Sequence, residues 1–140
     1  MNVKRLLVAI VAGYVVIFTT DWLIHEKWLA PDYAATQQVW RAKEDMASLG
    51  LWFLGAQIVT VLTFVLLWTR WASTAQIGCA IGFGFLIGAF SGAWPMVLYA
   101  ILPIPGALAA KWFFAGIVQC ILLGSVTFYV YKPAASGTAN

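Results

Sequence analysis

Four long apolar stretches constrain the fold of this chain more than any other feature of its sequence. They cover residues 6–25, 49–69, 77–100 and 108–131, and each has the length of about 20 residues that a helix needs to cross a bilayer. Their apolar residues are continuous rather than alternating, which is atypical of the roughly 9–11-residue strands of membrane barrels. Because a backbone in lipid must satisfy its own hydrogen bonds, the stretches predict an all-α membrane protein, a four-transmembrane-helix bundle.

Composition excludes a soluble domain and a disordered chain. Of the 140 residues, 63% are hydrophobic and only 9% are charged, whereas an average soluble domain has roughly 25% charged residues. A disordered chain is not this apolar. The many aromatic residues (8 Trp, 5 Tyr and 9 Phe) are typical of helix ends at membrane interfaces. We therefore expect the lipid bilayer as the main surroundings of the chain and no nucleic acid among its partners.

The predicted domain organisation is one transmembrane domain, residues 1–132, followed by a flexible tail, residues 133–140. A basic pair before the first apolar stretch is similar to the start of a secretory signal, but no small-x-small cleavage site follows, so we interpret the stretch as a membrane helix. A short amphipathic outer segment is expected between the first two helices, because Pro31 and Asp32 are typical of a helix start. It is either an interfacial helix or an extension of the second membrane helix.

Basic residues near helix ends indicate the orientation of a membrane protein. Four of them lie on each side of the predicted bundle, so their number does not determine the orientation. The N-terminal pair, Lys4 and Arg5, and the short connection that begins at Arg70 favour a cytoplasmic location for both termini.

Asp21 and His25 are the chemistry-bearing residues nearest the membrane interior. The middle thirds of the four predicted helices contain no ionisable residue, and such residues inside a membrane are usually functional. Asp21 is expected about one turn inside the outer end of the first helix, with His25 at i+4 on the same face. In the structural interpretation, Asp21 hydrogen-bonds His25 or pairs with Lys111. In the functional interpretations, the pair handles a proton or a ligand, or joins a loop carboxylate such as Glu44 in a metal site.

Small residues form a stripe on each of the last two predicted helices. Three glycines of the third helix share one face at about 100° per residue, and a similar stripe follows on the fourth. Such stripes let helix backbones approach closely, so we expect packing within the bundle. Contact with a partner subunit and a glycine-lined pore are the alternatives. The stripe residues are Gly84, Gly88, Gly92, Gly116, Cys120 and Gly124.

Two glutamines, Gln57 and Gln119, fall near the middle of the second and fourth predicted helices. A buried amide needs a hydrogen-bond partner, and we expect an interhelical hydrogen bond between these two side chains; a polar lining for a substrate is the alternative.

Pro95 is expected to kink the third helix, and residues 102–106 are expected to form a rigid turn. The two cysteines come from different depths, too far apart for a disulfide.

Several classes of function lack the residues that they need. A single histidine excludes haem ligation by paired histidines, and no Ser/His/Asp or Cys/His combination can be assembled in the membrane. Small four-helix multidrug exporters need a carboxylate deep in their first helix, where this chain carries apolar residues. We therefore predict no cofactor, no metal and no catalytic residue.

Short motifs along most of the chain carry a resemblance to known proteins. They are Asp21-Trp22-Leu23-Ile24-His25, Tyr33…Thr36…Trp40-Arg41…Glu44-Asp45-Met46, Tyr99-Ala100…Pro103-Ile104-Pro105-Gly106 and Lys111-Trp112-Phe113. Together they resemble a group of small bacterial integral membrane proteins of unknown function. The resemblance implies a four-helix architecture and a bacterial inner-membrane setting, and it implies no activity.

Three functions are consistent with these observations. The first is a non-catalytic accessory or interaction subunit that contacts other membrane subunits or copies of itself, as the glycine stripes suggest. The second is a small transporter or proton-linked carrier that uses the face of Asp21 and His25. The third is a membrane metal protein or enzyme that uses Asp21, His25 and Glu44.

Overall fold

The long helices of the structure are those that the sequence predicts. The computed structural model describes residues 2–72 and 76–131, and the regular elements within these ranges are all helical. Four helices in the described residues are long and apolar enough to cross a membrane, and the first of them runs as far as Trp28. Their length and composition indicate a membrane protein. The tail predicted at residues 133–140 lies outside the described residues.

Two of the long helices end in π-helical segments that the sequence does not predict. The four are α1 (Val3–Asp21), continued by η1 (Trp22–Trp28); α4 (Gly50–Leu67), continued by η3 (Trp68–Ala72); α5 (Ile77–Ile101); and α6 (Gly106–Val130). α5 continues as one helix through Pro95. Residues 102–105 then form the predicted turn into α6.

The segment between η1 and α4 folds into three short pieces instead of one amphipathic helix. They are α2 (Ala30–Ala35), the 3₁₀-helix η2 (Gln37–Val39) and α3 (Lys43–Ser48). α2 begins as expected, with a proline and an aspartate in its first turn. The chain then turns back because Trp40 packs edge-on against Tyr33, and the Trp40 indole donates to Thr36 Oγ1 at 2.9 Å. The backbone at Trp40 is extended, which separates η2 from α3.

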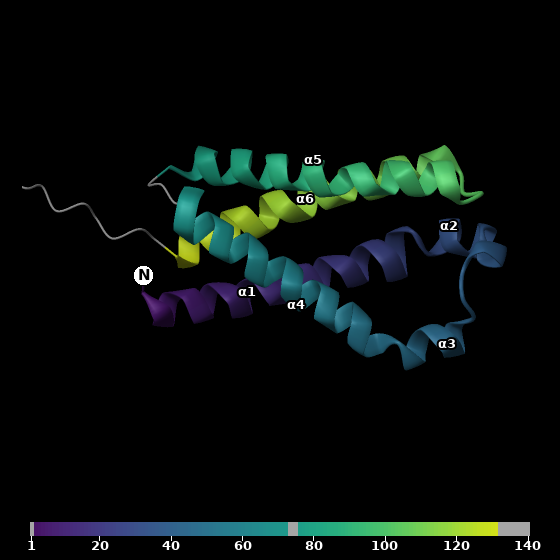
Figure 1. Ribbon diagram of the computed structural model, residues 1–140, viewed down its shortest axis with the longest axis horizontal. Coiled ribbons are helices and arrows are strands. Elements are labelled where there is room, and N and C mark those ends of the chain that lie inside the picture. The colour runs from purple at the N-terminus through teal and green to yellow at the C-terminus, as the bar shows by residue number, and fades with distance from the viewer. Residues whose placement is uncertain (1, 73–75, 132–140) are drawn as a thin grey trace, which may run out of the picture.

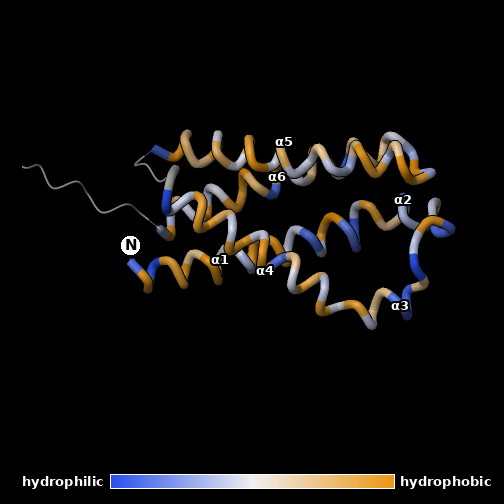
Figure 2. The backbone as a smooth tube through the Cα atoms, viewed as in Figure 1, coloured by the Kyte–Doolittle hydropathy of each residue, from blue (hydrophilic) through white to orange (hydrophobic). Residues whose placement is uncertain are grey.

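The four long helices alternate in direction, and they form an open bundle. α5 and α6 form an antiparallel hairpin, and α1 packs against both α6 and α4. Figure 1 shows the N-terminus beside the last turns of α6, at what we name the terminal end, and α2, α3 and the α5–α6 turn at the opposite, loop end. α4 diverges from α1 toward the loop end. Apolar residues follow all four helices, and hydrophilic residues gather near helix ends and around α3 (Figure 2).

The glycine stripe of α5 packs directly on α6, as expected for contacts within the bundle. A Cβ atom added at Gly88 would lie 2.6 Å from Ile117 Cα, and one at Gly92 would lie 2.8 Å from a ring carbon of Phe113. Gly84 lies against the backbone of α6 as well. This face is therefore covered by the same chain, which leaves it neither for a partner subunit nor for a pore lining.

The stripe predicted on α6 is only partly used in this packing. Gly124 is part of it, because a Cβ atom there would lie 2.6 Å from the Ala80 carbonyl oxygen. Gly116 was expected to pack in the same way and does not, since an added Cβ atom would meet nothing within 4 Å in the described residues. The backbone of Gly116 still contributes to the contact, since a Cβ atom added at Gly88 would lie 3.0 Å from the Gly116 carbonyl oxygen.

Two apolar clusters lie at different levels of the bundle. The larger one fills the terminal half and includes Ile17 of α1 and Cys120 of α6, and the smaller one at the loop end joins Leu29, Ile104 and Leu108. Between the two levels α1 and α6 carry polar side chains. The first turns of α4 are exposed; Leu51, for example, is 81% exposed.

Candidate functional site

Asp21 joins side chains of three long helices. Its Oδ2 accepts a hydrogen bond from Gln57 Nε2 of α4 at 2.6 Å, and its Oδ1 accepts one from Gln119 Nε2 of α6 at 2.7 Å. Gln119 Nε2 also donates to Thr20 Oγ1 at 2.9 Å. We name Asp21, Gln57 and Gln119 the polar triad. All three residues are half-buried, so the triad lies between helices rather than on an open face.

Asp21 lies deeper along its helix than the sequence suggested. The first span continues to Trp28 instead of ending near His25, so Asp21 is about two turns from the end of the helix rather than one. Its partner Gln119 is close to the middle of α6, which runs from Gly106 to Val130. Along its helix, the carboxylate is therefore about one turn further from the end than we expected, and the residues between it and Trp28 include the polar His25, Glu26 and Lys27.

The hydrogen bond expected between Gln57 and Gln119 is not formed, and neither is either of the two contacts expected as alternatives for Asp21. The two glutamine amides donate to the Asp21 carboxylate rather than to each other, because an ionised carboxylate is the stronger acceptor. In the described residues, Asp21 forms no hydrogen bond with His25 or Lys111, because both side chains reach other partners at the loop end. His25 Nδ1 lies 2.6 Å from the Tyr33 hydroxyl, and Lys111 Nζ lies 2.8 Å from Asp32 Oδ1.

The helix changes its hydrogen-bond pattern at Asp21. Asp21 is the last residue of α1 and directly precedes the π-helix η1, in which the N–H of Leu29 reaches back five residues to the carbonyl of Ile24 at 2.8 Å. π-helical segments are rare and are frequent at functional sites. This change of backbone geometry therefore supports a functional role for the residues around Asp21.

One acceptor of the polar triad is not used. Gln57 Oε1 is buried, and within the described part of the chain it has no hydrogen-bond partner. A buried acceptor without a partner lowers the stability of the folded protein by roughly 1–3 kcal/mol. In a native structure such an atom indicates a bound water, a ligand or a functional role. The triad thus combines a carboxylate with a free amide oxygen.

His25 and Lys111 belong to a separate network of hydrogen bonds and an ion pair, which connects α2 to α6 at the loop end. The Tyr33 hydroxyl, bonded to His25, also accepts from Trp112 Nε1 at 2.8 Å. Lys111 reaches both carboxylate oxygens of Asp32; the two side chains are 35% and 22% exposed, so the pair is of modest strength. This network closes the loop end over the small apolar cluster, which is a structural role.

Tyr33 gives this network a dependence on pH. Burial raises the pKa of Tyr33 above its ordinary value of 10.0, opposed by the hydrogen bond from Trp112 and assisted by the charge of Asp32. The folded state therefore holds the phenol proton more tightly than the unfolded state. The stability that this group contributes is complete below pH 10.0 and is lost as the pH rises through the raised pKa.

Titration of the phenolate absorbance measures this effect. The difference between the wild type and Tyr33→Phe is expected to show a phenol that ionises later than a free tyrosine. Tyr129→Phe, the same change at a tyrosine outside this network, is the control for the loss of one phenol. A Tyr33 phenol that titrates at 10.0 would contradict the burial that we describe.

Glu44 takes no part in either group of side chains. It lies on α3 and is exposed. In the described residues, no group of three or more His, Cys, Asp or Glu side chains is close enough to hold a metal ion. The geometry therefore gives no support to a metal centre or an enzyme built on Asp21, His25 and Glu44. Cys79 and Cys120 are both free, as expected.

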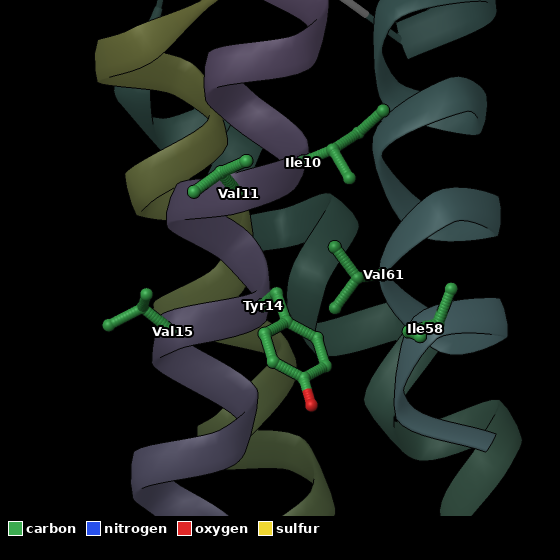
Figure 3. Close-up of a pocket in the computed structure, with 6 residues that line it drawn as sticks. All are labelled: Ile10, Val11, Tyr14, Val15, Ile58 and Val61. Atoms are coloured by element: carbon green, nitrogen blue, oxygen red, sulfur yellow. The ribbon is translucent and has the colours of Figure 1, made fainter. Parts of the chain in front are cut away.

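Two hollows lie along α4. The first, of about 250 Å³, lies between α1 and α4, and Figure 3 shows the Tyr14 ring between the two helices beside Ile58 and Val61. Its lining is apolar apart from the Tyr14 hydroxyl. The second, which we name the loop-end cavity, has a volume of about 550 Å³ and is lined by Val39, Trp40, Arg41, Met46, Leu49, Trp52, Phe53, Ala56 and Leu102.

Comparison of the chain with family models, curated proteins and solved structures finds no match. The resemblance to small bacterial membrane proteins therefore stays a prediction.

Proposed function

We propose that the protein is a small proton-linked carrier in which Asp21 binds and releases a proton inside the membrane. The observation that carries the proposal is a carboxylate on one membrane-length helix held by amides from two others. An ionisable side chain in lipid is costly, and it typically marks a proton or ion pathway. Neutral amides or hydroxyls could form hydrogen bonds between three helices without the cost of placing an ionisable group in lipid.

The partners of Asp21 suit a group that changes its charge. A glutamine carries a donor, Nε2, and an acceptor, Oε1. Each amide donates to Asp21 while the carboxylate is ionised, and after rotation of the amide its oxygen can accept from the protonated carboxyl. A lysine or arginine partner would instead favour the ionised form. The triad therefore offers hydrogen bonds to both states of the carboxyl group.

Packing around the triad supports access from one side. Toward the terminal end, the large apolar cluster begins at Ile17 and Cys120, each one turn or less from a triad residue. Toward the loop end, α4 diverges from α1 (Figure 1), and its first turns are exposed. Asp21 would then take up its proton from the loop end, and release to the other side would need α4 to move against α1.

Proton movement into vesicles tests the proposal. Wild-type protein in liposomes is expected to move protons down an imposed potential faster than protein-free vesicles do. Asp21→Asn should reduce the rate to that of protein-free vesicles, because the amide keeps the shape of the side chain and cannot ionise. Asp45→Asn, the same change at an exposed residue of α3, should keep the wild-type rate.

Infrared spectroscopy provides the second measurement, because a carrier with an unknown co-substrate can fail to move protons alone. The wild-type minus Asp21→Asn difference spectrum is expected to contain a carboxyl band that appears and disappears with pH. A carboxylate that stays ionised at every pH at which the protein is folded, together with unchanged flux in Asp21→Asn, would refute the proposal.

We further propose that the carrier lies in a bacterial inner membrane with both termini in the cytoplasm. The resemblance supports the setting, and Lys4, Arg5 and Arg70 support the orientation. The loop end would then face outward, so a cysteine introduced at exposed Gln37 in a cysteine-free background should react with an impermeant maleimide in intact spheroplasts. Reaction only after lysis would reverse the orientation.

The accessory-subunit role is a second candidate, favoured by one observation. Gly78 and Gly82 form a Gly-x-x-x-Gly step at the start of α5, and Cβ atoms added there would meet nothing within 4 Å in the part of the chain that the structure describes. Such steps are typical of contacts between membrane helices. Crosslinking in native membranes should therefore give an adduct that Gly82→Ile removes. A strictly monomeric protein that co-purifies with nothing would end this candidate.

A further inference from the structure

The loop-end cavity carries an inference that does not depend on proton binding by Asp21. Its walls come from the end of η2 and the connection that follows it, from α3, from the first turns of α4, and from the turn between α5 and α6. Arg41 is the single charged residue of its lining, and the others are apolar or aromatic. The cavity thus combines a large apolar volume with one cation.

The position of the cavity makes a hydrocarbon chain its natural occupant. Trp52 lines it, is 78% exposed, and lies in the first turns of a helix that is apolar enough to cross a membrane. Trp40 and Trp52 are of the residue type that is enriched where hydrocarbon meets headgroups. Water is disfavoured in an apolar cavity, so in a bilayer an acyl chain is the occupant that suits this hollow.

Arg41 is available to a phosphate group. In residues 2–72 and 76–131 it forms no ion pair. Glu44 and Asp45 follow it closely in sequence, but α3 begins only at Lys43, so Arg41 lies outside the helical register in which residues three or four apart face each other. A guanidinium group matches the geometry of a phosphate with two parallel hydrogen bonds.

We propose that the loop-end cavity binds one acyl chain of an anionic glycerophospholipid whose phosphate pairs with Arg41. A lipid tail is as apolar in the bilayer as in the cavity, so the preference comes from the headgroup. In a zwitterionic lipid the headgroup carries its own ammonium group, which competes for the phosphate. An anionic lipid lacks that competitor, and the guanidinium group is its counter-ion.

Native mass spectrometry of the protein released from phosphatidylglycerol nanodiscs tests the proposal. The wild type is expected to retain one lipid. Arg41→Gln should retain it about tenfold less, because the neutral amide removes the counter-ion and can keep at most one of the two hydrogen bonds to the phosphate. Lys43→Gln, a matched loss of charge on an exposed residue outside the lining, should behave as the wild type does.

A second variant addresses the acyl chain separately from the charge. Ala56→Phe places a ring in the cavity and is expected to displace the lipid while Arg41 is intact. Circular dichroism and the melting temperature establish that each variant is folded. Equal retention by Arg41→Gln and the wild type, or equal retention of phosphatidylcholine and phosphatidylglycerol, would overturn the proposal. So would a protein dimer that Ala56→Phe dissociates, because the occupant would then be a second copy of the chain.

Discussion

Replacement of Gly88 by isoleucine is expected to separate α5 from α6 and to lower the stability of the folded protein. The Cβ atom of the new side chain would lie 2.6 Å from Ile117 Cα. The neighbour is backbone, so it cannot swing aside as a flexible side chain can, and one helix must move. Overpacking of this kind typically costs about 1–3 kcal/mol, and here it also disturbs Gly84 and Gly92, which share the interface.

Thermal unfolding in detergent, followed by circular dichroism, measures this effect. Gly55→Ile is the matched control, because it makes the same change in another membrane-length helix, α4, at a position where an added Cβ atom meets nothing within 4 Å in the described residues. Equal loss of stability in both variants would mean that helix propensity or detergent, rather than the α5–α6 contact, is responsible. An unchanged Gly88→Ile would contradict the packing of the hairpin.

The sequence predicts the long helices because their signal is local. Twenty consecutive apolar residues have no other stable arrangement in a bilayer, and the glycine stripes indicate that two of the helices approach closely. The π-helix after Asp21 has no such local signal, so the first helix is longer than expected. Leu29, which directly follows the π-helix, packs against Ile104 and Leu108, which lie far away in sequence.

The residues of the polar triad were identified from the sequence, but their pairing was not. Asp21, Gln57 and Gln119 each stand out as polar groups in apolar helices. Which of them meet depends on the rotation and depth of three helices, and a sequence defines neither. A deeper Asp21 brings one carboxylate between two amides. The donor and acceptor inventory then fixes the result, since two amides and a carboxylate pair better through the carboxylate.

The loop-end network was missed for a different reason. Tyr33, Trp40 and Trp112 are aromatic residues at a membrane interface, where the sequence indicates anchoring to lipid. In the structure they pack against each other, and the hydroxyl of Tyr33 joins His25 to Trp112. The only local signal was Asp32 at a helix start, and it did not indicate the ion pair with Lys111.

Asp21→Leu is expected to destabilise the protein, and adding Gln57→Leu and Gln119→Leu is expected to restore its stability. The single change leaves Gln57 Nε2 without its acceptor, whereas Gln119 keeps Thr20 Oγ1. An unpaired buried donor costs roughly 1–3 kcal/mol, and the interhelical bonds lost in a membrane are worth about 0.6–2 kcal/mol. The triple variant removes the carboxylate and both amides of the polar triad together, so none of them is left without a partner, and its leucines suit the membrane interior.

Thermal unfolding and proton flux, measured on the same three proteins, separate the two roles of the triad. If Asp21 is present for proton binding, the triple variant should be at least as stable as the wild type and should carry no protons, because an ionisable group in lipid is retained against its cost only where function needs it. A triple variant less stable than Asp21→Leu would assign the triad to holding α1, α4 and α6 together. In that case the two hydrogen bonds on Asp21 would be worth more than the desolvation of its carboxylate, and the argument for a carrier would lose its main support.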